Sequence, residues 1–239
     1  MDSDTLARRN QQVLYDKKWI IFLRRTWPFR FIPFADFAVA AGSMALGNVN
    51  LESDFDVIVG ARAGRIFTAR FFAVAIFGLL GWRRKKLSHK EAAADKICLN
   101  HFITPKTFRL SPPHDKYWQV LYANLVPIFG DQARIADFFA ANQDWAHLHG
   151  GQAGRERLQA SDPRFLYRRP SAIKVIVEKL LSGVAGSWLE KLLRNFQIRR
   201  IERSLLRDPS GYKPRIKYND EELEFHPDTR RIEILDKSL

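Results

Sequence analysis

Residues 36–59 read DFAVAAGSMALGNVNLESDFDVIV, and this stretch decides the fold that we expect for the chain. Residues 36–41 form an apolar run that is typical of a buried strand, and the run leads directly into Gly42-Ser43. Ser43 is a competent N-cap for a short helix. Residues 47–53 have the composition of a loop, and the β-branched content of 54–59 indicates a second strand. The predicted order is strand, glycine-serine turn, short helix, loop and strand.

Two carboxylates stand at the start of the second strand. Asp54 and Asp56 are separated by one residue, so the alternation of side chains along a strand points both to one face, about 7 Å apart. Phe55, Val57 and Val59 then point to the opposite face, where we expect them in a core. Magnesium prefers hard oxygen ligands and keeps positions open for phosphate oxygens. The pair therefore predicts a site for a divalent metal ion beside bound phosphate, as phosphoryl chemistry requires.

The Gly42-Ser43 turn is the candidate anion site. A glycine lets the backbone approach a phosphate closely, and the helix that follows offers unpaired N–H groups. A glycine-serine turn or an Asp-x-Asp pair alone is common at turns and strand ends; their combination in this order favours phosphoryl chemistry. Arg62, Arg65 and Arg70 follow the second strand and offer guanidinium groups to phosphates. We take Arg65 as the nucleotide-binding candidate, whereas Arg70 fits a solvated helix face better.

The turn and the strand 54–59 together resemble the Gly-Ser and Asp-x-Asp motif of DNA polymerase beta-type nucleotidyltransferases. This superfamily includes CCA-adding enzymes and antibiotic nucleotidyltransferases. The motif match extends from Asp36 to about Ile103, and a looser likeness to uncharacterised bacterial nucleotidyltransferase-domain proteins spans most of the chain. The resemblance implies that Gly42 and Ser43 contact the triphosphate and that Asp54 and Asp56 bind Mg²⁺. It also implies transfer of a nucleoside monophosphate to a hydroxyl acceptor.

The family normally adds a third carboxylate on a neighbouring strand, and this sequence departs from that pattern. In the expected third strand, 97–103, the polar candidates are Asn100 and His101. An amide oxygen binds magnesium less strongly than a carboxylate and cannot act as a base. The possible substitutes are Asp95, Glu91 and Glu52, of which Asp95 is the best. The predicted catalytic set is therefore Asp54, Asp56 and Asp95, and the alternative is a module that binds nucleotide or RNA without turnover.

The chain is strongly basic. It has 239 residues, 46% of them hydrophobic, and its 39 Lys and Arg against 26 Asp and Glu give a formal net charge of +13. Such a surplus attracts polyanions, which favours RNA over a small drug as the acceptor, although an ordinary basic protein is an equal alternative. Arginines recur at helical spacing near the C-terminal end. The arginines of this helix could bind a nucleic-acid backbone, or they could form a solvent-exposed helix surface. A third alternative is that the helix binds a membrane surface through its apolar side. The arginines are Arg194, Arg199, Arg200, Arg203 and Arg207, and the apolar side chains are Trp188, Leu189, Leu192 and Leu193.

Two features bear on the compartment. Cys98 is the only cysteine, so no disulfide forms within one chain, and we expect a cytoplasmic protein in which Cys98 packs as a small hydrophobe. Residues 66–82 are apolar, but Thr68 and Arg70 leave a clean run of about 12 residues, too short to span a bilayer. We therefore expect a buried helix there and no integral membrane segment. The oligomeric state is not specified by the sequence.

The expected fold class is α/β in the broad sense, with a small mixed sheet and flanking helices. The change of character at Pro112-Pro113 suggests a nucleotidyltransferase-like domain over residues 1–112 and a mostly helical region over 113–239. A terminal hairpin within 215–235 is expected to turn at His226-Pro227-Asp228. The other expected elements are helices over 117–125 and 132–142, a loop over 152–170 that follows His147 and His149, and two helical stretches within 173–206.

Overall fold

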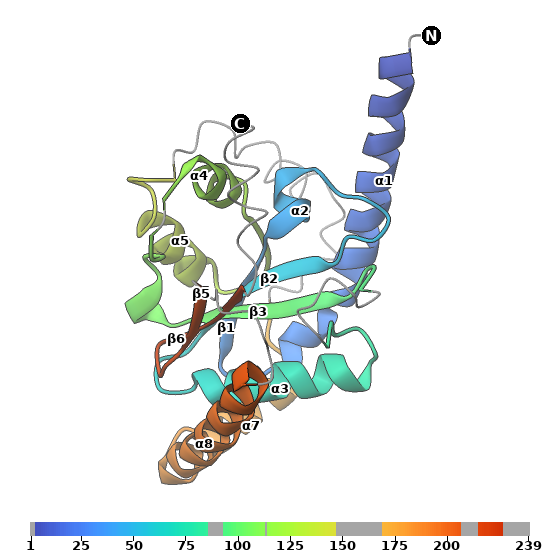
Figure 1. Cartoon of the computed structure of the whole chain (residues 1–239). Helices are drawn as coiled ribbons and strands as arrows, with labels where there is room; N and C mark the ends of the chain where they lie inside the picture. Colours follow the sequence, from blue (N-terminus) through green and yellow to red (C-terminus); the bar gives the residue numbers. More distant parts are fainter. Residues whose placement is uncertain (1–2, 86–92, 113, 147–168, 207–214, 227–239) are drawn as a thin grey trace.

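A computed structural model describes residues 3–85, 93–112, 114–146, 169–206 and 215–226 (Figure 1). These residues form seven α-helices, two short 3₁₀ helices and six strands, so the chain is a mixed α/β protein, as the sequence predicts. No helix in this part of the chain has both the length and the apolar character that a bilayer crossing requires.

One six-stranded sheet organises the described residues, in the order β4-β1-β2-β3-β6-β5. β2 and β3 are parallel, and every other neighbouring pair is antiparallel. The strands are β1 (Ala35–Ala40), β2 (Phe55–Ala61), β3 (Ile97–Ile103), β4 (Val126–Gly130), β5 (Arg215–Tyr218) and β6 (Glu222–His226). The two central strands, β2 and β3, are those that bring the candidate site residues together.

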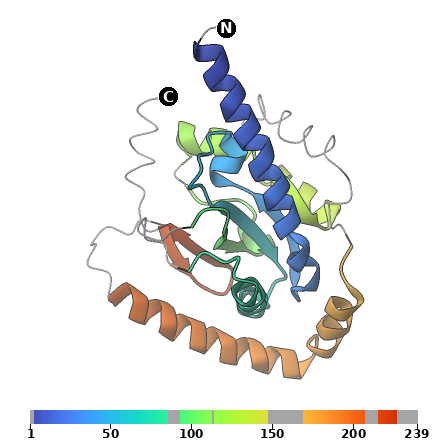
Figure 2. The ribbon, with the colours of Figure 1, turned by 90° about the vertical axis from the view of Figure 1, so that its right-hand side faces the viewer.

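Helices cover both faces of the sheet. α1, α3 and α8 lie on one face, with α3 between the sheet and α8, while α2, α4 and α5 lie on the other (Figures 1 and 2). The helices are α1 (Ser3–Arg25), α2 (Gly42–Leu46), α3 (Ile66–Leu79), α4 (Lys116–Ala123), α5 (Gln132–Ala140), α7 (Ala172–Leu180) and α8 (Val184–Leu206), with 3₁₀ helices η1 (Trp27–Phe31) and η2 (Pro105–Thr107).

The alternation along β2 divides the two faces. Phe55, Val57 and Val59 are fully buried in the core beneath α1 and α3, which confirms the sequence expectation for them. Phe22 of α1 stacks on Phe55 with ring centroids 4.6 Å apart. Ile58 points to the other face and joins the second core, under α2, α4 and α5. The even-numbered positions of β2 therefore face α2 and α4, and this face carries the candidate site.

Three expectations about elements differ from the structure. Residues between α4 and α5 form the strand β4, which the sequence did not predict because Pro127 interrupts it; as an edge strand β4 tolerates a proline. The terminal hairpin turns at Asn219–Glu221, between β5 and β6, and not at His226-Pro227-Asp228. The N-cap of α2 is Ala41 and not Ser43, because the helix begins at Gly42 and Ser43 is its second residue.

The expected boundary at Pro112-Pro113 falls between elements that share one sheet. β4 pairs with β1, and β6 pairs with β3, so strands from both sides of the boundary lie next to each other. Leu223 and Phe225 of β6 belong to the same core as Phe55. The loop 152–170 that the sequence predicts lies almost entirely outside the described residues.

Candidate functional site

The two acidic residues of the motif lie together at the start of β2. Asp54 directly precedes the strand, and Asp56 is its second residue. A carboxylate oxygen of each and the Cys98 sulfur all lie within 4.8 Å of one another. Since Ile58 packs against the α2 and α4 side, both carboxylates face that side of the sheet as well.

Gly42 brings the glycine-serine turn against this pair. Its φ is +57°, and a Cβ built on it would lie 2.0 Å from Asp56 Oδ2. The Ala41 N–H donates to the Asp56 backbone carbonyl at 3.0 Å, which fixes the turn to the strand. Only glycine fits here, because it accepts the positive φ and leaves room for the carboxylate. The turn and the acidic pair thus face each other, as the sequence predicts, and Ser43 follows as the second residue of α2.

The neighbouring strand β3 presents a thiol and an amide to the pair. Cys98 lies beside Asp56 in the parallel register and is 2% exposed. The Asn100 side-chain amide donates to Asp56 Oδ1 at 3.4 Å. Cys98 is buried, as expected, but its sulfur faces two carboxylates and not a purely apolar core. Among the described residues no third carboxylate joins the group of Asp54, Asp56 and Cys98.

Arg84 is a member of the site that sequence reasoning left without a role. Its Nη1 lies 2.8 Å from Asp54 Oδ2, and both side chains are largely buried. The Arg84 N–H donates to the Ile97 carbonyl at 2.9 Å, and the Ile97 N–H donates to the Trp82 carbonyl at 2.6 Å. These bonds hold the segment beside the start of β3, so the guanidinium is aimed at Asp54. The run of basic residues after α3 was the only signal in the sequence.

The ionisable groups of the site change one another's pKa values. Burial, and then the negative charge of Asp54, raise the pKa of Asp56 to about 7. Burial, followed by the same two carboxylates, raises the pKa of the Cys98 thiol well above its usual value. Burial, and then the charge of Asp56, raise the pKa of Tyr117 to about 12. The phenol of Tyr117, on α4, is therefore a further neighbour of the site, and its sequence distance from Asp56 hid it from prediction.

Asp95, the expected third carboxylate, is engaged elsewhere. Its carboxylate pairs with Lys18 Nζ of α1 at 2.8 Å, and its backbone carbonyl accepts a hydrogen bond from Arg25. Its own N–H donates to the Ser53 carbonyl at 3.1 Å. Asp95 thus ties the loop before Asp54 to α1, and its oxygens do not join the Asp54 and Asp56 group. Two other residues were proposed in place of the third carboxylate. Glu52 is an exposed loop residue, and Glu91 lies outside the described residues.

The arginine candidates contact other parts of the chain. Arg65 Nη2 donates to the Ser182 carbonyl at 3.3 Å and to Ser187 Oγ at 3.2 Å, so the guanidinium joins α3 to the start of α8. Arg62 pairs with Asp36 and Glu178 at 3.0 and 3.1 Å. Arg70 is partly buried, not solvated as expected, and donates to Gln197 Oε1 at 2.7 Å.

His101, the second polar candidate of β3, belongs to a separate group. Its Nε2 lies 3.1 Å from Glu222 Oε1, and Glu224 completes a buried cluster across β3 and β6. Lys217 Nζ lies 3.0 Å from Glu222 Oε2 and supplies a positive charge. Burial raises the pKa of Glu222, but the bond to His101 and then Lys217 outweigh it and hold that pKa below its usual value. His147 and His149 lie outside the described residues.

Neither a family model, nor a curated protein, nor a solved structure matches this chain. The chemistry of the site must therefore be argued from its own residues. Two adjacent carboxylates are hard oxygen ligands that could hold a divalent ion, and Asp54 would be free to bind it only if Arg84 left the ion pair. Cys98 adds a softer donor.

Proposed function

We propose that the chain binds a nucleoside triphosphate with a divalent metal ion at Asp54 and Asp56 and transfers the nucleoside monophosphate to a hydroxyl acceptor. The acceptor oxygen bonds to the α-phosphorus, the bond between the α- and β-phosphates breaks, pyrophosphate leaves, and the hydroxyl proton passes to water. The observation that supports this most directly is the contact of Gly42 with Asp56, which brings a glycine-serine turn and an acidic pair to one place. Two acidic residues at the start of a strand, without the turn, would not indicate a functional site.

In this proposal Asp54 and Asp56 hold Mg²⁺, which supplies positive charge to the phosphate oxygens when bound. The residues fit the ion in kind, because both are hard carboxylate ligands with oxygens close together. Gly42 lets the backbone of the turn approach the phosphates, and the Ser43 hydroxyl offers a hydrogen bond to them. Arg84, once it leaves Asp54, is a second cation within reach of the same phosphates. RNA remains the favoured acceptor because of the basic charge of the chain.

Incubation with labelled nucleoside triphosphates, Mg²⁺ and total RNA tests the proposal. We expect label to enter the RNA with the unchanged chain and to be lost in Asp54→Asn and Asp56→Asn, which keep the side-chain shape and remove the charge. Glu52→Gln is the matched control, since it removes an exposed carboxylate from the neighbouring loop. Equal incorporation by the Asp56→Asn variant would contradict the proposal.

The second candidate is a module that binds nucleotide or RNA without turnover. It is favoured by one observation, that β3 offers the thiol of Cys98 and the amide of Asn100 where a base would be required. This reading predicts Mg²⁺-dependent binding of nucleotide by equilibrium dialysis, abolished by Asp56→Asn, together with no incorporation under any condition. Incorporation and binding measured on the same set of variants therefore distinguish the enzyme from the binding module.

A further inference from the structure

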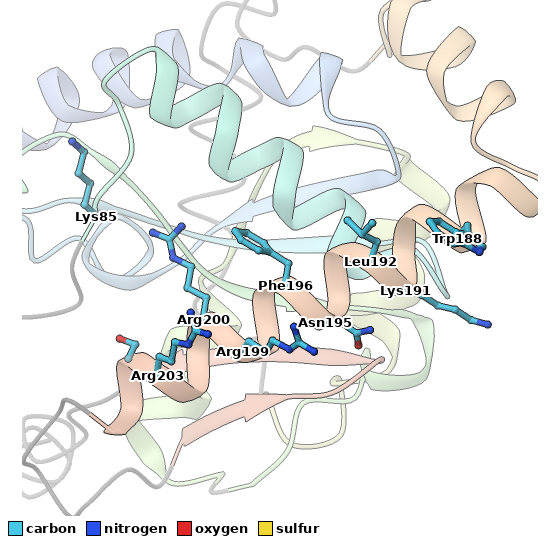
Figure 3. A pocket seen from close by; sticks show the side chains of 10 residues that line it. Lys85, Trp188, Lys191, Leu192, Asn195, Phe196, Arg199, Arg200 and Arg203 are labelled. Atoms are coloured by element: carbon cyan, nitrogen blue, oxygen red, sulfur yellow. The ribbon is translucent and has the colours of Figure 1, made fainter.

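The helix α8 has two chemically different sides. The inner side packs on α3 and the sheet, and its buried residues include Glu190, Leu193, Gln197 and Ile201. The outer side lines a groove of about 1170 Å³, together with Lys85 (Figure 3). We call this side the outer face of α8. The residues of α8 that line the groove are Trp188, Lys191, Leu192, Asn195, Phe196, Arg199, Arg200, Arg203 and Ser204.

An apolar row runs along the outer face. Trp188, Leu192 and Phe196 follow one another at intervals of four residues, so they lie on one side of the helix. They are 71%, 52% and 52% exposed, respectively. More than half of the exposed large apolar side chains of the described residues lie on α7 and α8. Apolar side chains gathered in this way mark an interaction surface.

The same face is cationic and lacks acidic partners. Lys191, Arg199, Arg200 and Arg203 are exposed, and none of them forms an ion pair with another described residue. No carboxylate is among the described residues that line the groove. By contrast, Arg194, which is turned toward the hairpin β5–β6, pairs with Asp220 at 2.5 Å. The positive charge of the outer face therefore remains available for an anionic partner.

The positive potential extends inward from this face. The pKa of Arg70 is lowered to about 10, first by burial and then by repulsion from Arg83 and Arg200. Arg200, on the outer face, therefore lies close enough to Arg70 for the two positive charges to repel each other. An anion bound at the outer face would relieve this repulsion.

We infer that the outer face of α8 binds a membrane surface that contains anionic lipid headgroups. Trp188, Leu192 and Phe196 would enter the boundary between headgroups and acyl chains, while Lys191 and the three arginines would contact the phosphates. Apolar side chains flanked by Lys and Arg on one side of a helix are the arrangement that binds such an interface. Each cation near an anionic surface strengthens binding by about fivefold.

The position of the face favours a membrane over a polynucleotide. α8 lies outside α3 on one face of the sheet (Figure 2). Asp54 and Asp56 face α2 and α4 on the other, since Asp56 contacts Gly42 of α2. If RNA is the acceptor of the proposed function, its reacting end must lie at the acidic pair, and the outer face of α8 has no acidic residue among the described residues that line its groove. The aromatic rings are also separated by Leu192 and do not form a continuous platform for bases. The choice of a membrane over RNA rests on the proposed function, because it uses the position of Asp54 and Asp56, whereas the apolar row and the cations of the outer face do not.

Vesicle flotation with the full chain tests the inference. We expect binding to vesicles of equimolar phosphatidylcholine and phosphatidylglycerol, and binding at least about tenfold weaker to phosphatidylcholine alone. The triple variant Arg199→Glu, Arg200→Glu, Arg203→Glu should lose about 100-fold or more in affinity. Trp188→Ser with Phe196→Ser should weaken binding while leaving its salt dependence in place.

Matched controls come from α1, which has exposed residues of the same kinds. Arg9→Glu with Lys17→Glu, and separately Val13→Ser, change charge and apolar area away from the outer face and should leave vesicle binding within about twofold. Circular dichroism checks that every variant is folded, as expected for exposed positions. Asp54→Asn should also bind vesicles normally.

Three outcomes would overturn the inference. The first is no binding to the anionic vesicles. The second is vesicle binding that the outer-face variants do not weaken beyond the α1 controls. The third is binding of single-stranded RNA, lost in the triple arginine variant, by a chain that does not bind vesicles, which would assign the face to a polynucleotide.

Discussion

Gly42 is the residue on which the geometry of the acidic pair depends. Gly42→Ala would place a methyl group 2.0 Å from Asp56 Oδ2 at a φ of +57°, so either the turn or the carboxylate must move. We expect a loss of about 2–4 kcal/mol in the free energy of unfolding and loss of Mg²⁺-dependent nucleotide binding. Denaturant unfolding and equilibrium dialysis measure the two effects.

Gly47→Ala is the control for this substitution. Gly47 also has a positive φ, +77°, but a Cβ there would meet nothing within 4 Å. It should cost only about 1–2 kcal/mol and leave nucleotide binding intact. Equal loss of binding in both variants would mean that backbone strain, and not the contact with Asp56, explains the effect.

Asp56 makes stability depend on pH in the absence of divalent metal. Its folded pKa of about 7 lies above the unfolded value of 3.8, so the folded chain binds more protons between these pH values. The free energy of unfolding should therefore fall as pH rises from about 4 to 7, by on the order of 3 kcal/mol from this group. Asp56→Asn should flatten that part of the profile, measured by urea unfolding with chelator. An unchanged slope would show that Asp56 is ionised in the folded chain.

Asn100 decides between the two candidate functions. Asn100→Asp would put a third carboxylate next to Asp56, whose Oδ1 lies 3.4 Å from the amide. If turnover is limited by the missing base, incorporation of labelled nucleotide should rise at least about tenfold, because a positioned base contributes roughly 100- to 10,000-fold. Asn124→Asp, at the half-buried C-cap residue of α4, is the control. A rise in both variants would point to a general charge effect.

At the scale of elements, α8 completes the N-terminus of α3. Arg65, the N-cap of α3, makes no side-chain capping bond, and the Glu190 carboxylate of α8 accepts instead from the N–H groups of Phe67 and Thr68, at 2.9 and 2.8 Å. A cap normally comes from the chain just before the helix, but this one comes from a residue over 120 positions later.

Glu190→Ala should therefore destabilise the chain by about 2–3 kcal/mol, because it leaves two buried N–H groups without an acceptor. Glu190→Gln retains one acceptor oxygen and should cost less. Glu202→Ala, at an exposed position of the same helix, should change the free energy of unfolding by less than about 0.5 kcal/mol. Thermal unfolding of the three variants checks the order, and a Glu190→Ala variant as stable as Glu202→Ala would contradict it.

Some elements are predictable from local sequence and others are not. The apolar runs of β1, β2, β3 and α3 are continuous, and the structure has all four within a few residues of the predicted bounds. β4 is short and contains Pro127, so nothing local distinguishes it from a loop. β6 carries Glu222 and Glu224, which read as solvated residues but are buried by pairing with β3 and contact with His101.

The same distinction applies to the candidate site. Asp54, Asp56 and Gly42 are close in sequence, and alternation along one strand with one turn suffices to bring them together. Arg84, Cys98 and Tyr117 reach the site only because elements that are separate in the sequence pack together, so local sequence does not predict them. Asp95 shows where prediction from sequence spacing fails. Its ion pair with Lys18 depends on how α1 packs beside the start of β3, and the spacing of residues in the sequence does not indicate this packing.

At the scale of the whole molecule, the sheet joins the two ends of the chain. Leu223 of β6 is fully buried in the core that Phe55 and Phe22 share, so residues 1–112 lack part of their own core. We expect a fragment of residues 1–112 to show no cooperative thermal transition. A sharp transition, followed by circular dichroism, would instead support two independent domains.

Leu223→Ala in the full chain tests the same point without truncation. It should lower the free energy of unfolding by about 2–5 kcal/mol, as expected for a large-to-small change in a core. Leu51→Ala, which is 75% exposed, should have an effect below about 0.5 kcal/mol. Equal effects of the two changes in urea unfolding would mean that β6 contributes little to the fold.

The ion pair between Arg84 and Asp54 has a consequence for how the chain matures. Negative side chains that folding brings together repel each other unless a cation is nearby. Here the Arg84 guanidinium pairs with one of the two carboxylates from within the polypeptide. Folding of this region therefore needs no divalent ion to offset the charge of Asp54, and under the proposed function an arriving ion would take the place of Arg84.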